Sequence, residues 1–221
     1  MDFKLRAGVS FCDAGGRILF LDIRRDRYFG LPAAGERAFR RFVAGDPLDD
    51  GDRAALEAIA GNGLLEPSKD CLRPHPCLRG PEPTLSLIDE KGRPRQIAVV
   101  AALSRLALAG VALRTRPLTS VLESFQRRKA AMKPPAGDSL RPLAEVAAAF
   151  RLSRLIASPL DRCLPRSLAA AHGLLDRDIV PELVFGVRLQ PFAAHCWVRH
   201  GQVLVNESLD QVRNFTPILT L

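Results

Sequence analysis

A cysteine, a histidine and an acidic residue lie in the last third of the sequence, in an order that suits nucleophilic catalysis. Cys163 falls at or near the first turn of an expected helix, His195 on an expected strand, and Glu207 after the next strand. A thiol at a helix N-terminus feels the positive end of the helix dipole, which lowers its pKa and favours the nucleophilic thiolate. The pattern predicts a reactive cysteine, although a buried structural cysteine explains Cys163 equally well when this feature is taken alone.

The histidine has the placement that a general base needs. Alternation along its strand puts His195, Trp197 and Arg199 on one face, and Cys196 and Val198 on the other. A base on a rigid strand that faces a helix N-terminus can form a Cys–His pair, whereas a lone histidine on a strand is usually just packed. We interpret Cys196 as a packing residue whose thiol points away from the site.

The base also needs an acceptor that orients its ring. A turn at His200-Gly201 returns the next strand toward His195, and that strand ends in Asn206 and Glu207. Alternation allows only one of these two side chains to point at the imidazole, so the residues leave both possible. This chemistry needs no metal and no cofactor, and none is expected.

Helices precede strands in the part of the chain that carries these residues. Apolar periodicity predicts helices over 97–113, 118–129, 139–150 and 159–174, and strands over 179–188, 194–199 and 202–206. Ser139 can cap the third helix, and Ser158 or Asp161 the fourth. The first helix is apolar nearly all round, which predicts that it is covered on most sides. It is short for a membrane span and has Arg105 in its middle, so no span is expected.

The first 66 residues follow a different pattern. Strands are expected over 9–12, 17–23 and 27–31, followed by helices that end near Gly45 and Gly61. The strands form an antiparallel meander whose last strand is an edge with unpaired backbone groups. We therefore expect a small three-stranded, winged-helix-like domain here.

Five prolines between residues 67 and 83 predict a linker, because repeated prolines oppose both helix and central strand. We expect two domains, 1–80 and 81–221, and an α+β fold overall. Within this stretch Cys71, His75 and Cys77 are too few, and too irregularly spaced, to predict a zinc site.

Charge and targeting signals narrow the function classes. The net charge is +8, but residues 1–80 carry 13 basic and 12 acidic groups, and the excess lies mainly in residues 81–150 with 11 and 6. No dense basic run accompanies a reading element, which argues against nucleic-acid binding. The start lacks an apolar signal segment, and the five cysteines are irregularly spaced, so a reducing cytoplasm is expected.

Three phrases carry a family resemblance: residues 163–168, residues 195–198, and the ending 205–217 with its Asn206-Glu207 and Asn214-Phe215-Thr216-Pro217. Together they resemble the B protein of lasso-peptide biosynthesis, a transglutaminase-like leader peptidase, over residues 85–221. The first 80 residues resemble the precursor-recognition element of such clusters, which is similar to the small protein of pyrroloquinoline quinone biosynthesis. The chain thus resembles the fused form, a winged-helix-like domain followed by a papain- or transglutaminase-like domain.

The resemblance implies roles for three residues. Cys163 matches the family nucleophile and His195 the base, while Glu207 stands twelve positions after the histidine, where the family usually has Asp. Glutamate is one methylene longer, so Asn206 is the fallback for orienting the ring. The family often has Ala where this chain has Cys196.

The resemblance also implies partners. A precursor leader peptide would add a strand beside Arg27–Leu31, and pockets between that strand and the 52–60 helix would supply specificity. Arg27, Tyr28, Phe29 and Arg53 are the expected contacts, although Tyr28 and Phe29 can instead fill the small core. An ATP-dependent, asparagine-synthetase-like cyclase that closes the macrolactam is the second implied partner.

Two alternative functions stay open. A winged-helix DNA-binding regulator could be built on residues 1–66, but the nearly balanced charge there argues against phosphate contact. A transglutaminase-like acyltransferase could use the same three catalytic residues and transfer the acyl group to an acceptor other than water.

Overall fold

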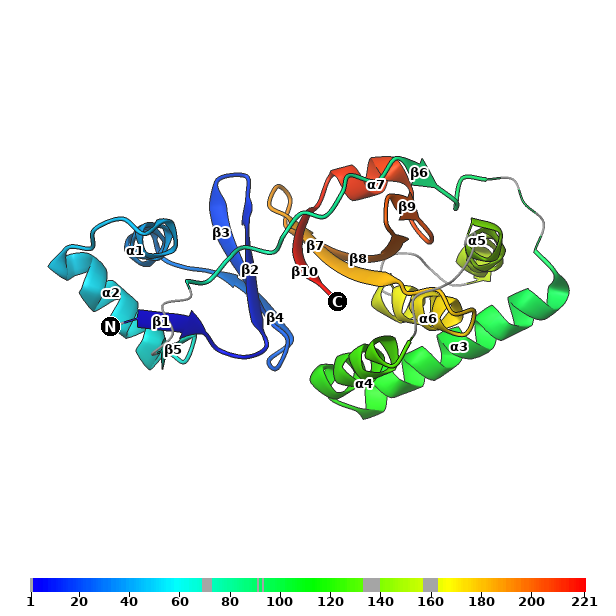
Figure 1. Cartoon of the computed structure of the whole chain (residues 1–221), viewed down its shortest axis with the longest axis horizontal. Helices are drawn as coiled ribbons and strands as arrows, with labels where there is room; N and C mark the ends of the chain where they lie inside the picture. The colour runs from blue at the N-terminus through cyan, green and yellow to red at the C-terminus, as the bar shows by residue number, and fades with distance from the viewer. Residues whose placement is uncertain (1, 69–72, 91, 93, 133–139, 157–162) are drawn as a thin grey trace. The chain divides into compact units, whose positions relative to one another are not determined.

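The structure, a computed structural model, describes residues 2–68, 73–90, 92, 94–132, 140–156 and 163–221 (Figure 1). The chain divides into two compact units, Met1–Leu78 and Arg79–Leu221. Both units combine helices with antiparallel strands, which confirms the mixed α and β composition expected from the sequence.

The first unit contains the expected three-stranded meander. Strands β2 (Val9–Ala14), β3 (Arg17–Asp22) and β4 (Arg27–Gly30) pair antiparallel in that order. Within the described part of the chain β4 pairs only with β3, so it is an edge strand, as predicted. A further strand, β1 (Asp2–Leu5), pairs antiparallel with β5 (Leu65–Ser68) and was missed, because its partner lies some sixty residues away and no local turn announces the pairing.

Helices α1 (Ala33–Ala44) and α2 (Asp50–Gly61) follow the meander. α1 ends at Gly45, whose φ of 85° is a left-handed conformation that glycine adopts without steric cost. α2 begins with a capping box between Asp49 and Asp52. The helices and the sheet enclose an aromatic cluster of Phe11, Phe20 and Phe39, with ring centroids 5.0–5.8 Å apart. This cluster is the core that holds β4 in place.

The expected linker is more fixed than its prolines suggest. The Cys77 N–H donates to the Phe11 carbonyl at 2.8 Å, which keeps this end with the first unit. In the second unit the Arg199 guanidinium donates to the Pro81 carbonyl at 3.0 Å, and it lies so close to Gly80 that a Cβ there would displace it. Hydrogen bonds therefore hold this stretch at Cys77 and at Pro81. Cys71 lies outside the described residues.

The second unit is built on a five-stranded sheet of order β10-β7-β8-β9-β6. The strands are β6 (Leu85–Ser86), β7 (Glu182–Arg188), β8 (Ala193–His200), β9 (Val203–Leu204) and β10 (Thr216–Thr220), with the short helix α7 (Leu209–Arg213) between β9 and β10. The predicted antiparallel strands are present. Strand β6, which precedes the helices and pairs parallel with β9, was not expected, since two residues carry no readable period.

In the part of the chain that the structure describes, four helices lie between β6 and β7: α3 (Gln96–Thr115), α4 (Leu118–Ala130), α5 (Leu140–Ile156) and α6 (Cys163–Leu175). α6 packs against β8, and it also contacts α3 and α5. The apolar face predicted for α5 is buried, including Leu143 and Phe150 at 1% exposure each. The caps proposed at Ser139, Ser158 and Asp161 lie outside the described residues.

The prediction that α3 is covered on most sides is wrong. Only Ala102 and Ala109 on it are buried, because α5 and α6 contact just one side of the helix. By length and composition α3 could cross a membrane, with a mean hydropathy of 1.9, yet only 11% of that apolar window is buried. Arg105 in its middle is ion-paired with Asp176, just after α6, and the Nε–Oδ2 distance is 2.7 Å. This ion pair fastens α3 to α6.

Candidate active site

Cys163 is the first residue of helix α6, in agreement with the expected position at or near the first turn of a helix. Burial opposes ionisation of the thiol, but a hydrogen bond with His195 and backbone hydrogen bonds at Cys196 and Leu164 outweigh it and lower the pKa of Cys163. Arg166, one turn further along α6, is buried. The thiol therefore has the surroundings of a nucleophile.

His195 lies on β8 between the thiol and a buried carboxylate. Its Nε2 is 2.7 Å from Oε2 of Glu207, which is only 5% exposed. Burial alone would lower the pKa of His195, yet the hydrogen bonds to Cys163 and Glu207 raise it to about 9. At neutral pH His195 is accordingly an imidazolium held by Glu207, and the lowered pKa of Cys163 favours the thiolate beside it.

Asn206 has a different position from Glu207. Its Oδ1 accepts the Val198 N–H at 2.8 Å, and its Nδ2 donates to Ser167 Oγ at 2.8 Å. Ser167 in turn donates to the Cys196 carbonyl at 2.8 Å. Asn206 thus ties β8 to α6, while Glu207 is the residue in contact with the imidazole.

Two serines that the sequence analysis did not single out position the site. Ser167 follows Cys163 by four residues, so it shares a helix face with the thiol and could have been found from that spacing. Ser86 on β6 donates to the backbone carbonyl of Glu207 at 3.0 Å. No sequence signal points to Ser86, because 121 residues separate it from its partner.

Aromatic rings enclose the imidazole. The ring centroid of His195 lies 6.3 Å from that of Trp197 and 5.2 Å from that of Phe215. Gly186 on β7 pairs directly with His195, and a Cβ there would come within 2.5 Å of the Trp197 ring. Glycine at this position makes room for the indole, and Trp197 and Phe215 then limit where the imidazole can lie.

The expectation that the Cys196 thiol turns away from the site needs correction. Cys196 is a packed residue with 2% exposure, and burial raises its pKa well above the ordinary value. Its thiol, however, hydrogen-bonds to Ser167 on α6 and interacts electrostatically with Cys163. The reason is that α6 covers the sheet face to which Cys196 points, with Cys163 at the end of the same helix.

We expect kcat/KM to depend on pH with an alkaline limb near pH 9. Above the pKa of His195, about 9, the imidazolium loses the proton that a leaving group must receive. Below the lowered pKa of Cys163 the thiolate is protonated, which gives the acid limb. Alkylation of Cys163 by iodoacetamide should follow the acid limb only, because it needs the thiolate but no acid. An alkaline limb near 6.5, the ordinary pKa of histidine, would contradict this pairing.

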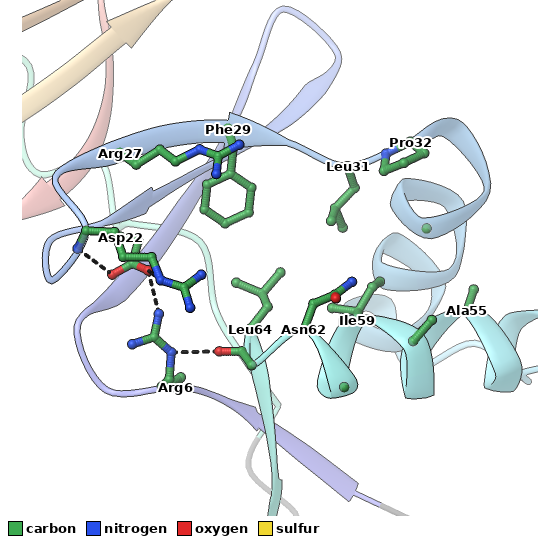
Figure 2. A pocket seen from close by; sticks show the side chains of 15 residues that line it. Arg6, Asp22, Arg27, Phe29, Leu31, Pro32, Ala55, Ile59, Asn62 and Leu64 are labelled. Atoms are coloured by element: carbon green, nitrogen blue, oxygen red, sulfur yellow. Dashed lines mark hydrogen bonds and ion pairs between the residues drawn. The ribbon is translucent and has the colours of Figure 1, made fainter.

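A second candidate site lies in the first unit, where β4 and α2 border a cavity of about 750 Å³ (Figure 2). Arg27 and Phe29 line it from β4, and Ala55, Ala58 and Ile59 line it from α2. This is the position expected for a pocket beside an added strand. The structure brings two of the four expected contact residues, Arg27 and Phe29, to the cavity.

The other two expected contacts do not line it. Tyr28 lies on the opposite face of β4, because neighbouring strand residues point to opposite sides. Arg53 on α2 forms an exposed ion pair with Asp50, with 3.8 Å between Nη1 and Oδ1. Phe29 also has the structural role that the sequence left open, because its ring stacks on Phe20 with centroids 5.4 Å apart. It therefore contributes to both core and cavity.

The rim of this cavity is basic and held in place. Nη2 of Arg6 donates a hydrogen bond to Oδ2 of Asp22 at 2.5 Å, and its Nε donates to the Gly63 carbonyl at 2.6 Å. Figure 2 shows this network at one side of the cavity. The Arg27 guanidinium lies over the Phe29 ring, 5.8 Å from its centroid. An apolar floor with arginines at the rim suits a peptide that has an apolar side chain near a carboxylate.

The second unit has the elements of acyl-transfer enzymes that use a cysteine, a histidine and an acid: a thiol at a helix start, a base on a strand, and a carboxylate that holds the base. The family model of the transglutaminase-like superfamily matches residues 102–220, more than half of the chain and including all three residues. The chain therefore belongs to the transglutaminase-like superfamily. Comparison with curated proteins and with solved structures returns no significant match.

Proposed function

We propose that this protein is a cysteine peptidase that binds the leader of a ribosomally made lasso-peptide precursor and removes it. The observation that carries the proposal is the combination of two sites in one chain. The second unit holds Cys163, His195 and Glu207 in hydrogen-bonding contact. The first unit offers an edge strand beside a cavity of about 750 Å³.

In the proposed reaction the Cys163 thiolate attacks the scissile carbonyl carbon, and the negative charge passes to the carbonyl oxygen. Backbone N–H groups at the start of α6 stabilise that oxygen. His195 gives its proton to the leaving amine as the C–N bond breaks, which leaves a thioester on Cys163. Water then attacks the thioester while His195 takes its proton, and Glu207 keeps the ring oriented through both steps.

The leader is proposed to bind as an added strand along β4. Backbone pairing supplies affinity for any extended peptide, and specificity comes from side chains that reach the cavity. The cavity lining has apolar residues such as Leu31 and Ile59 beside Arg25 and Arg27. Tyr28 and Arg53 remain proposed contacts of the parts of the leader that lie outside the cavity.

The proposed partners are the precursor peptide and an asparagine-synthetase-like cyclase that closes the macrolactam after cleavage. The resemblance of residues 163–168, 195–198 and 205–217 to the B proteins of lasso-peptide biosynthesis supports this partnership. The proposed reaction takes place in the cytoplasm, where the precursor is made and where Cys163 stays reduced.

Filling the cavity should block leader binding. Ala58 is exposed and lines the cavity, so Ala58→Trp places an indole there without entering the core. We expect the Kd for a fluorescent leader peptide to rise at least about tenfold, because an apolar anchor loses its pocket. Fluorescence anisotropy with the full chain measures the change.

Ala54→Trp is the matched control, because Ala54 is an exposed residue of the same helix that does not line the cavity. Its affinity for the leader should equal that of the wild type. Equal affinities for wild type and both variants would mean that the leader binds elsewhere, and that result would remove the recognition half of the proposal.

A further inference from the structure

Helix α3 carries a row of exposed apolar side chains. Ile97, Val100, Leu108 and Val111 are exposed by 73%, 62%, 69% and 56%. Their spacing by three, eight and three residues puts them on one side of the helix, opposite the side held by Ala102 and Ala109. An apolar row of this kind in a folded domain marks an interaction surface.

A cavity of about 530 Å³ adjoins this row, between α3, α4 and α6. Leu108 belongs to both the row and the cavity lining, so the two are continuous. Buried apolar residues form part of the floor, among them Ala109, Val121 and Leu168. The cavity is large enough to receive one or two bulky apolar side chains. We call the row and the cavity together the α3 surface.

Most of the charges around the α3 surface are positive. Residues 96–130 carry six basic residues and one acidic residue. In the cavity Asp176 is shared by Arg105 and Arg128, so two guanidinium groups share one carboxylate. Arg116 donates to Ser120 Oγ at 3.3 Å and has no carboxylate partner among the residues described. The rim therefore has a positive excess that a negatively charged partner would neutralise.

We propose that the α3 surface docks an acidic amphipathic segment of another protein, with an apolar side chain in the cavity and carboxylates against Arg116 and Arg128. A second copy of this chain fits poorly, because two identical basic faces would repel each other. A lipid surface fits poorly as well, because it cannot fill a concave cavity that contains an ionised Asp176. The proposal does not depend on the leader-binding site or on Cys163.

The test pans a display library of helix-forming peptides against the full chain, with counter-selection against the Leu108→Asp variant. Leu108 is largely exposed, so this variant should unfold at the same temperature as the wild type. Selected peptides should place acidic residues on either side of a bulky apolar residue. The synthetic peptide should bind less tightly as salt increases.

Two variants and a control then locate the binding. Leu108→Asp and Arg116→Glu should each raise the Kd of that peptide at least about tenfold. Leu78→Asp replaces an 82% exposed leucine of the first unit and should leave the Kd unchanged. Exchange of the peptide's acidic residues for lysine should abolish binding.

Four results would overturn the proposal. The first is selection of peptides without acidic residues, and the second is a Kd that Leu108→Asp leaves unchanged. The third is binding of phosphatidylglycerol vesicles that Leu108→Asp abolishes, which would assign the α3 surface to a membrane. The fourth is a dimer in sedimentation velocity that Leu108→Asp dissociates, which would assign the surface to a second copy.

Discussion

Replacing Cys163 with alanine should abolish release of the leader while leaving its binding intact. The thiolate forms the covalent intermediate, and the neighbouring Cys196 cannot replace it, because that thiol is buried and its pKa is raised. Loss of a catalytic nucleophile lowers kcat by roughly 10³-fold or more. Mass spectrometry of a full-length precursor incubated with the full chain measures the release, and anisotropy measures the binding.

Cys77→Ala is the matched control, because Cys77 is a half-buried cysteine of the first unit. It should cleave the precursor as the wild type does. Cleavage that persists in Cys163→Ala would show that this thiol is not the nucleophile. If the wild type forms the leader amide when an amine is added, but no free leader acid without it, then acyl transfer is the reaction and hydrolysis is not.

Exchange of Glu207 for glutamine should impair catalysis without unfolding the protein. Glutamine keeps the size of the side chain but replaces the carboxylate that stabilises the imidazolium by a neutral amide, which can also turn its NH2 group toward the ring. The comparable change at an aspartate–histidine pair lowers kcat by about 10⁴-fold. The pKa of His195, about 9 in the wild type, should fall because the hydrogen bond and the charge of Glu207 both raise it. The alkaline limb of kcat/KM should therefore move to lower pH.

Asn206→Ala should destabilise the protein but leave the pH dependence of catalysis unchanged. It leaves the buried Val198 N–H without its acceptor and removes the link from β8 to Ser167, so the free energy of unfolding should fall by about 2 kcal/mol. The folded fraction keeps Glu207 on the imidazole, and its alkaline limb should stay near 9. Urea denaturation and the pH–rate profile separate the two effects. A shift of the limb in Asn206→Ala alone would assign the orienting role to Asn206.

The sequence left open which of Asn206 and Glu207 orients the imidazole, and the reason is geometric. Consecutive residues after a strand point in opposite directions, so the chain order admits either Asn206 or Glu207 as the acceptor. The choice depends on which side of the turn faces the imidazole, and hence on the parallel pairing of β6 with β9 and the bond from Ser86 to the Glu207 backbone. Both contacts join segments more than a hundred residues apart.

The edge strand could be predicted from local sequence patterns, but the residues that line its cavity could not. Alternation and turn residues correctly predicted the meander and its edge at β4. The position of α2 across the cavity from β4 decides which of the expected contacts line it. Arg27 and Phe29 line the cavity, and Tyr28 does not. The direction of a side chain follows from strand period, but the presence of a neighbour follows from packing.

The sequence by itself determined the thiol at a helix start, the histidine on a strand, the order of helices before the sheet, and membership of a transglutaminase-like superfamily. These features depend on periodicity and short motifs, which neighbouring residues encode. Tertiary structure alone decided that Glu207 contacts His195, that Cys196 packs on α6, and that α3 has an exposed apolar row. Apolar composition shows that a helix can be covered, but only the arrangement of its neighbours shows which side they reach.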